Sequence, residues 1–570
     1  MLGLFYTILL IMVKRSTTMK NQIHLLILFL LIAMVISCDS VLDTTPNDRF
    51  TEDAVWSDPT LVDAFVSHTY RSIPTGFVYS LYNLSAVTDE INARSNAWSW
   101  GVIAGNMTPD NLGFVDFWTD VRSGSGVNRS YWKPIYLVNE FMENIDRTEF
   151  ENPDLRNRMI AEMRVIRAKS YFRLISLFGG VPLINSTFDL DDDFRMERNS
   201  YEEVMQFVLE ELELAIPDLE LQSEMSTSDY GRISKGAAMG LKSRALLYYA
   251  SPLNNPSNDL SRWEAAQQAA RDVIDLGEYE LFDDYRTSFL EENIYNSEMI
   301  WQRPFNQLNS AETVYIELSS YPNGYNGFGQ IHPIQNLVDD YETIRGLKPE
   351  DDPEFDPQDP YVERDPRFYA TILHDGMFWK GREVETFLPG GLDSNEGPVS
   401  AWNATETGYY SRKFVNERID DPSGSNMSQT PWPFIRFAEI LLNYAEASYF
   451  LGEEDTARES LNRVRSRPSV DMPPVTESGD ELFDRIVNER RIELVFEQHR
   501  WYDVRRWMIA EEVLNEDQTR MSIRKQEDGS KTYEVLFWKE ANFQAPRDYL
   551  LPIPQSEIDR NGLLEQNPGY

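Results

Sequence analysis

The chain has 570 residues, of which 93 are acidic and 53 are basic, giving a formal net charge of −40. A surface this acidic repels phosphate backbones, so nucleic acid is a poor partner, and basic residues give it no hold on a membrane. The length is ample for a large hydrophobic core. Aromatic residues make up 12% of the chain, which suits such a core or a face that binds sugars.

The chain begins with an apolar segment that ends at Cys38, the only cysteine. Lys20 supplies a positive charge, residues 25–36 are almost wholly apolar, and the small residue Ser37 precedes the cysteine. This is the pattern of a secretory signal peptide, and residues 35–38 resemble a bacterial lipobox, in which cleavage leaves a lipid-bearing cysteine at the new terminus. A buried core cysteine behind a simple signal is the alternative. The apolar run is short for a membrane-spanning helix, and acidic residues follow it at once.

We therefore predict a signal peptide over residues 1–37, with translation starting at Met19, and a lipidated tether over residues 38–50. The removed segment contains three lysine or arginine residues and no acidic residue, so the mature chain is still more acidic. Once Cys38 carries lipid, no thiol remains for a disulfide, a metal site or a cysteine nucleophile. The acyl chains would then hold the protein on the membrane.

Helical patterns dominate residues 51–278, with a loop-like insert at 83–130. From Ala161 to Ile175, apolar residues recur every three or four positions, and two glycines follow, which predicts a helix and its end. Residues 279–433 are rich in Gly, Pro, Asn and Asp and have little periodicity, so we predict an irregular lobe there. Helical patterns return in a C-terminal region over 434–570, whose last part is Pro-rich coil.

One pair of predicted helices resembles a tetratricopeptide repeat. Between residues 441 and 464, small residues stand where helices would cross and Gly452 stands at the turn. Further pairs are predicted at 235–276, at 155–178 with 201–217, and at 51–70 with 131–146. The expected fold is all-α, with about four tetratricopeptide-like helical pairs that carry an irregular, loop-rich lobe. A generic helical bundle is the alternative.

Common enzyme and metal motifs are missing. No histidines are spaced as H-E-x-x-H, and no G-x-S-x-G elbow or phosphate-binding loop occurs. Asp189, Asp191 and Asp193 begin like a calcium loop, but Phe194 stands where that loop needs glycine. The acidic run at 350–359 is typical of a solvated loop, with calcium binding through its carboxylate oxygens as the alternative. We expect no catalytic residue, no metal and no cofactor. A glycoside hydrolase pair of carboxylates stays open, because the sequence gives no distances.

Charged residues recur on the C-terminal helical segments at spacings that allow pairing, and we expect them to form structural ion pairs. They are Arg436, Glu439, Arg490, Arg491, Glu493 and Arg500.

Short segments along the whole chain carry a family resemblance. Besides the lipobox they are residues 51–56, 164–172, 177–183, 231–238, 336–339, 364–367, 434–447, 488–494, 500–506, 551–558 and 566–570. Taken together and in this order, they are similar to the SusD/RagB outer-membrane lipoproteins of the Bacteroidetes. The resemblance implies a surface-exposed, lipid-anchored protein of the outer membrane. Such a protein binds a nutrient, usually a glycan or oligosaccharide and in some members a peptide, and serves a SusC-like TonB-dependent transporter.

The resemblance also implies that two inserts build the ligand face, and both are rich in aromatic and amide side chains. From the first insert and from residues 315–328 we predict ligand contacts for Asp89, Asn92, Arg94, Trp98, Trp100, Tyr315, Tyr321, Tyr325 and Asn326. Trp98 and Trp100 would share a face in an extended strand. The alternative is that these aromatics pack the lobe. A secreted glycoside hydrolase and a non-catalytic surface scaffold or peptide-binding protein remain the other functions to consider.

Overall fold

The computed structural model describes six ranges of the chain: 51–77, 83–93, 97–119, 130–305, 315–423 and 428–570. Cys38 and the whole predicted signal peptide and tether lie outside the described residues, so these predictions stay predictions. Within the six ranges, no helix combines the length and the apolar character needed to cross a membrane. Contacts divide the chain into two units, which in described residues are 51–65 with 145–149, and 66–144 with 150–570.

The smaller unit contains helix α2 (Glu52–Val55) and the start of α3 (Pro59–Arg71). Thr51 caps α2 by accepting a hydrogen bond from the backbone N–H of Ala54 at 3.3 Å. The ring of Trp56 lies 5.0 Å from that of Phe65, and the Thr148 hydroxyl donates to the Trp56 carbonyl at 2.7 Å. These contacts fasten residues 145–149 to the first helices of the chain.

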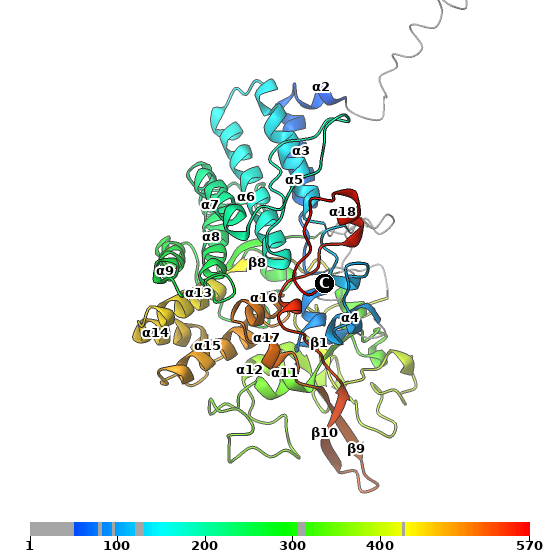
Figure 1. The fold of residues 1–570 in the computed structure, drawn as a ribbon. Coiled ribbons are helices and arrows are strands. Elements are labelled where there is room, and N and C mark those ends of the chain that lie inside the picture. The colour runs from blue at the N-terminus through cyan, green and yellow to red at the C-terminus, as the bar shows by residue number, and fades with distance from the viewer. Residues whose placement is uncertain (1–50, 78–82, 94–96, 120–129, 306–314, 424–427) are drawn as a thin grey trace, which may run out of the picture. The chain divides into compact units, whose positions relative to one another are not determined.

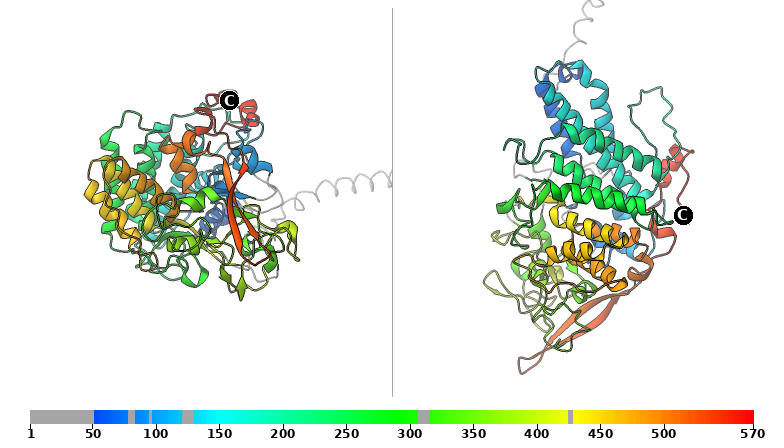
Figure 2. Two further views of the ribbon diagram at one scale, coloured as in Figure 1. Left: turned by 90° about the horizontal axis from the view of Figure 1, so that it is seen from below. Right: turned by 90° about the vertical axis from the view of Figure 1, so that its left-hand side faces the viewer.

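The larger unit is built around stacked antiparallel helices. Its long helices are α5 (Trp132–Asn144), α6 (Pro153–Phe178), α7 (Tyr201–Ala215), α8 (Lys235–Ala250), α9 (Leu260–Asp275), α13 (Phe437–Phe450), α14 (Glu454–Arg465) and α15 (Asp480–Glu493). Helices α6 and α7, α8 and α9, and α13 and α14 pack as pairs, and α9 packs on α13 (Figure 1). Green and yellow helices form successive layers in the right-hand view of Figure 2. Three of the four predicted pairs are therefore confirmed. The pairing of 51–70 with 131–146 stays a prediction.

Local sequence signals explain where these helices begin and end. Asn152 caps α6 by accepting from the Asp154 N–H at 2.9 Å, and Gly179 ends it at φ 72°. Ser200 and Glu203 form a reciprocal capping box at the start of α7. In the α13–α14 pair, Ala445 is fully buried, as the predicted helix crossing requires.

A network of buried charges joins the C-terminal helices to the rest of the larger unit. Glu493 on α15 accepts from Arg436 Nη1 at 2.7 Å, Arg467 Nη2 at 2.7 Å and Arg367 Nη1 at 3.0 Å. All four side chains are at most 1% exposed. The predicted structural ion pairing is confirmed, but these partners come from different elements rather than from one helix face.

Short elements make up the irregular lobe, the insert near the N-terminus and the C-terminal segment. The helices are α4 (Ala97–Ile103), α10 (Ile316–Ser320), α11 (Gln335–Asp340), α12 (Pro366–Thr371), α16 (His499–Arg506), α17 (Ala510–Val513) and α18 (Gln555–Arg560). The strands are β1 (Ile91–Ala93), β2 (Met299–Arg303), β3 (Ile331–Pro333), β4 (Ile372–Leu373), β5 (Phe378–Trp379), β6 (Arg382–Glu383), β7 (Tyr410–Ser411) and β8 (Trp432–Arg436). They pair antiparallel as β1–β3, β2–β8, β4–β7 and β5–β6.

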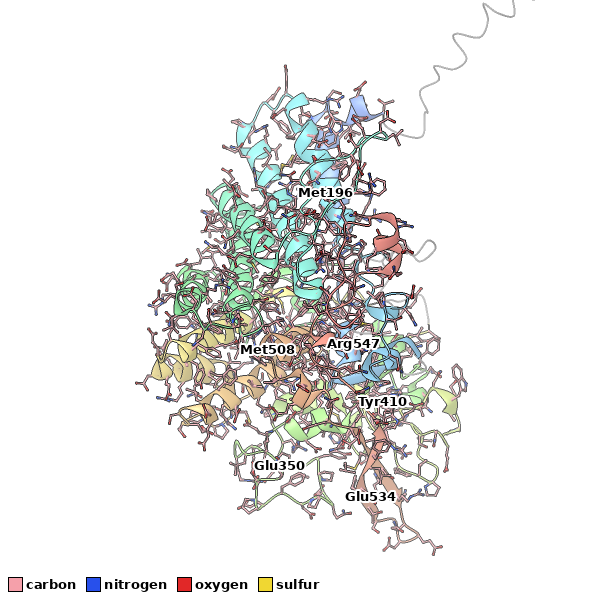
Figure 3. All side chains as sticks on the ribbon, viewed as in Figure 1. Met196, Glu350, Tyr410, Met508, Glu534 and Arg547 are labelled. Atoms are coloured by element: carbon pink, nitrogen blue, oxygen red, sulfur yellow. The ribbon has the colours of Figure 1, made fainter. Side chains whose placement is uncertain are left out.

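A hairpin of β9 (Gln518–Lys525) and β10 (Lys531–Lys539) extends away from the helices (Figure 1). The turn contains Asp528 and Gly529, whose φ of 88° favours glycine. Glu534 marks this hairpin in Figure 3, whereas Tyr410 lies inside the lobe. The sequence analysis predicted no strands in this region, so the hairpin is a departure from the expected all-α pattern.

Candidate ligand-binding face

Two loops of the lobe are fastened together around Asn323. The Asn323 amide donates to the Val399 carbonyl at 2.8 Å, and the Tyr410 hydroxyl donates to Asn323 Oδ1 at 2.9 Å. A few residues further on, the backbones of Gly329 and Asn403 touch, because a Cβ on Gly329 would lie 2.4 Å from the Asn403 carbonyl oxygen. We call the outer surface of these loops, residues 325–328 and 399–402, the loop face.

Aromatic side chains stand out from the loop face into solvent. Trp402 is 70% exposed and Phe328 is 37% exposed. Gly329 follows Phe328 and Asn403 follows Trp402, so the backbone contact between the two loops holds these rings in one region of the surface. Asn326, two residues before Phe328, is also exposed. Flat rings beside an amide can stack on the apolar face of a sugar while the amide bonds its hydroxyls.

The loop face rests on a rigid support. The Tyr325 hydroxyl donates to the Trp379 carbonyl at 2.8 Å, and the two rings meet edge-on at 4.7 Å. The guanidinium of Arg382 lies 3.8 Å from the centre of the Tyr325 ring and forms two hydrogen bonds to Asp393, at 2.6 and 2.8 Å. Burial raises the pKa of the Tyr325 hydroxyl, so it remains a donor at physiological pH. Such support fixes the rings before a ligand arrives.

The predicted contacts of the second insert divide between surface and interior. Asn326 is exposed, in the left-handed region at φ 63°, and Tyr315 is 44% exposed at the start of α10. Tyr325 is half-buried under Arg382. Tyr321 is fully buried and its hydroxyl donates to the Asn416 and Ile419 carbonyls, both at 2.8 Å. A ring buried in this way cannot stack on a ligand, so the structure removes Tyr321 from the predicted contacts.

Two predicted contacts of the first insert are also buried. Asp89 forms two hydrogen bonds with Arg500, at 3.0 and 2.7 Å, and pairs with Arg491. Burial would raise the pKa of Asp89, but Arg491 and Arg500 hold it well below its usual range. The Asn92 amide donates to Gln518 Oε1 at 3.3 Å, within β1. Both side chains therefore hold the fold together and do not present a ligand contact.

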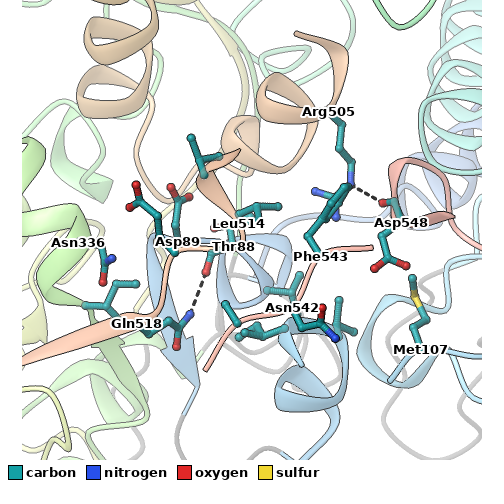
Figure 4. Close-up of a pocket in the computed structure, with 17 residues that line it drawn as sticks. Thr88, Asp89, Met107, Asn336, Arg505, Leu514, Gln518, Asn542, Phe543 and Asp548 are labelled. Atoms are coloured by element: carbon teal, nitrogen blue, oxygen red, sulfur yellow. Dashed lines mark hydrogen bonds between the residues drawn. The ribbon is translucent and has the colours of Figure 1, made fainter. Parts of the chain in front are cut away.

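The cavity beside Asp89 is small. Figure 4 shows it between Thr88, Gln518 and Asn542, with Gln518 donating to the Thr88 carbonyl at 3.4 Å. Its free volume of about 30 Å³ has room for one or two water molecules and none for a sugar ring.

The remaining candidates of the first insert lie in or beside α4. Arg94 lies outside the described residues, as do the side chains of Trp98 and Trp100. The backbone of both tryptophans is helical, so the predicted extended strand is wrong. Positions two apart on a helix point about 200° apart, and the two tryptophans cannot share one face in the way we expected.

Trp402 is a candidate that the sequence analysis missed. It sits in a short Ala-Trp-Asn turn of the Gly- and Pro-rich lobe, outside any helical pattern. An aromatic side chain beside an amide in a Gly- and Pro-rich loop is the same sequence feature that pointed to residues 315–328. No grouping of three or more His, Cys, Asp or Glu side chains suited to a metal ion is found among the described residues.

Comparison with known families places the chain. Residues 297–570 match the family model described as "SusD family", and residues 42–247 match one described as "Starch-binding associating with outer membrane". The chain belongs to the SusD/RagB family. A SusD-like protein of Bacteroides ovatus is 24% identical over 573 residues, which cover 93% of this chain and 94% of the relative.

Solved structures of SusD-like proteins share the fold. One from Bacteroides fragilis is 27% identical with a TM-score of 0.78, covering 92% of this chain and 100% of that chain. Another from the same species, described as a SusD-like carbohydrate-binding protein, is 26% identical with a TM-score of 0.77, covering 90% and 100%. The predicted family and the predicted helical-pair fold with an irregular lobe are confirmed.

Proposed function

We propose that this SusD-family protein is a surface lipoprotein of the outer membrane that binds a glycan on the loop face. It passes the glycan to a SusC-like TonB-dependent transporter. The observation that carries the glycan proposal is Trp402, a 70% exposed tryptophan held on two loops that Asn323 joins. An exposed tryptophan on a rigid support can stack on the apolar face of a sugar without a further cost for ordering the ring. A carbohydrate-binding relative of similar fold supports the same ligand class.

The role is binding and not catalysis. The rings of the loop face offer stacking surfaces and an amide, whereas glycoside hydrolysis needs two carboxylates about 5 to 9 Å apart across the bound sugar. Asp393, an acidic side chain beneath the face, is fully buried and engaged by Arg382.

The anchor and the domain limits belong to the same proposal. Cys38 carries the lipid after removal of residues 1–37, and residues 38–50 form the tether. Residues 51–278 and 434–570 form the helical regions, and residues 279–433 form the lobe. The pairing of β2 with β8 supports these limits, because it brings the beginning and the end of the lobe together at its base.

A matched pair of variants tests the glycan site. Trp402→Ala removes the most exposed ring of the loop face. Phe378→Ala is the control: it removes a 72% exposed ring of the same lobe, next to the buried Trp379 on β5. An array of glycans first identifies a ligand, and titration calorimetry then measures both variants. We expect Trp402→Ala to weaken binding at least about tenfold and Phe378→Ala to leave it unchanged. Equal affinity of the two variants would place the site elsewhere.

The transporter partner is tested separately. Crosslinking on intact cells, followed by purification of the protein from the outer membrane, should recover a TonB-dependent transporter. Recovery of the protein alone, from a strain that expresses a SusC-like transporter, would contradict this part of the proposal.

A further inference from the structure

A second hollow opens in the larger unit, with no residue in common with the loop face. It lies where the C-terminal end of α3 meets the turn at 230–232 and strand β2, and its volume is about 460 Å³. A space of this size accommodates one or two sugar rings. We call it the arginine pocket, after the three arginines that line it, Arg71, Arg232 and Arg303.

The charge of this pocket is opposite to that of the whole chain. The chain has 93 acidic and 53 basic side chains, yet none of the described residues that line the pocket carries a carboxylate. Two of the arginine side chains are held in place by hydrogen bonds to other parts of the protein. Arg303 donates to the Ile73 carbonyl at 2.8 Å, and Arg232 donates to Glu162 at 2.9 Å. Fixed guanidinium groups around an open space form a site for an oxyanion.

Behind the pocket, Arg232 pairs with Glu162 at 2.9 Å and with Asp229 at 3.5 Å. Although burial opposes it, Arg158 and Arg232 hold the pKa of Asp229 below its usual value, so this carboxylate is charged at neutral pH. Burial raises the pKa of Glu162 to about 7, despite the nearby Arg232 and Arg158. At neutral pH this carboxyl is therefore protonated for a substantial part of the time.

Behind the pocket wall, Lys169 Nζ lies 4.5 Å from the centre of the Phe434 ring and 5.8 Å from that of Trp301. Burial and the neighbouring arginines hold the pKa of Lys169 well below its usual value, so the positive charge of the pocket comes from its arginines.

A buried polar group in the wall lacks a partner. Gln302 is 3% exposed, and its Nε2 makes no hydrogen bond to any described atom. The same side chain lines the pocket and a cavity of about 20 Å³ that continues behind it. A buried N–H without a partner is unfavourable, and an acceptor in the pocket would satisfy it. Tyr230, 37% exposed at the rim, supplies an aromatic surface beside these donors.

We propose that the arginine pocket binds the acidic group of a charged saccharide, a carboxylate or a sulfate, between Arg71, Arg232 and Arg303. The Gln302 amide donates to the same group or to a water that it holds, and the sugar ring lies against Tyr230. The saccharide part of this inference rests on the proposed glycan-binding function. The ligand class is then an acidic glycan, which the neutral loop face alone would not select.

Titration calorimetry on the full chain in detergent tests the proposal. The probes are D-glucuronate, glucose and inorganic sulfate, each at one ionic strength fixed with sodium chloride. We expect glucuronate to bind and glucose to give no signal at this pocket. Arg71→Gln should weaken glucuronate binding about tenfold or more, because it removes a charge-assisted hydrogen bond. The control Arg195→Gln removes the same charge from an exposed loop and should leave binding unchanged.

Two further variants separate the possible results. Gln302→Glu places a carboxylate in the pocket wall, so it should abolish glucuronate binding. Trp402→Ala should keep glucuronate binding intact.

Equal losses in Arg71→Gln and Arg195→Gln would show a general charge effect and overturn the proposal. Inorganic sulfate binding as tightly as glucuronate would overturn its saccharide part. Glycan binding at Trp402 without glucuronate binding would refute this inference alone, whereas loss of both would refute the proposed function as well.

Discussion

Replacing Glu493 by glutamine should destabilise the larger unit strongly while leaving its packing volume unchanged. Glu493 lies within 2.7 to 3.0 Å of Arg436, Arg467 and Arg367, and its side chain is fully buried. Burial alone would raise the pKa of Glu493, but the three arginines hold it well below its ordinary value. Glutamine presents an N–H₂ group to at least one guanidinium, and it leaves the positive charges without their shared carboxylate.

The magnitude follows from the burial of the network. Breaking a buried ion pair by removing one partner costs about 3–5 kcal/mol, because the other charge stays in the interior. A chain of this size has an unfolding entropy of about 1 kcal/mol per kelvin, so Glu493→Gln should lower Tm by about 3–5 °C. Differential scanning calorimetry measures this shift directly.

A surface pair provides the control. Asp193 pairs with Arg195 at 2.7 Å, but both side chains are more than half exposed. Asp193→Asn should therefore leave Tm within the error of the measurement. If Glu493→Gln has the same Tm as Asp193→Asn and the unmodified protein, the network contributes no net stability and the reasoning from burial fails.

Three further perturbations test the scaffold, the pH response and the anchor. Ala445→Leu overpacks the crossing of α13 and should cost about 1–3 kcal/mol; an unchanged urea midpoint would contradict close helix packing there. Burial raises the pKa of Asp339 to about 6, so its contribution to stability is complete below pH ~4 and is lost as the pH rises through 6. Asp339→Asn should therefore gain stability relative to the unmodified protein between pH 4 and 7, and a constant difference in urea denaturation would refute this assignment. Cys38→Ala should abolish labelling with radioactive palmitate and release the protein from the membrane; retention of the variant would exclude lipid as the anchor.

The helical scaffold was predictable because its signals are local. Apolar residues at helical spacing, capping residues such as Asn152 and Ser200, and a glycine after α6 all act within a few residues. The β9–β10 hairpin has local signals too, in Asp528-Gly529 and in the alternation of Met521 with Ile523. Only these two apolar side chains of β9 are buried, so the pattern was too short to stand out in a charged segment.

The site was harder to predict because exposure is a tertiary property. Tyr321 and Asn326 stand five residues apart in one polar loop, yet the first is fully buried and the second is exposed. What separates them is the position of the Asn416 and Ile419 carbonyls, which lie almost 100 residues further along the chain. Trp402 was overlooked for the same reason. Its turn meets the 325–328 loop through contacts at Asn403 and Val399, which no sequence spacing specifies.

The bonds of Asp89 also set an order of events while the protein is made. Its partners Arg491 and Arg500 are 402 and 411 residues further along the chain. The helical pairs between them have short separations and can form as the chain emerges, whereas this loop closes only after nearly the whole chain is present. Until then the segment around Asp89 remains hydrated and open to proteases. Loss of the last eighty residues at any later time would return it to that state, so the integrity of one end of the molecule depends on the presence of the other.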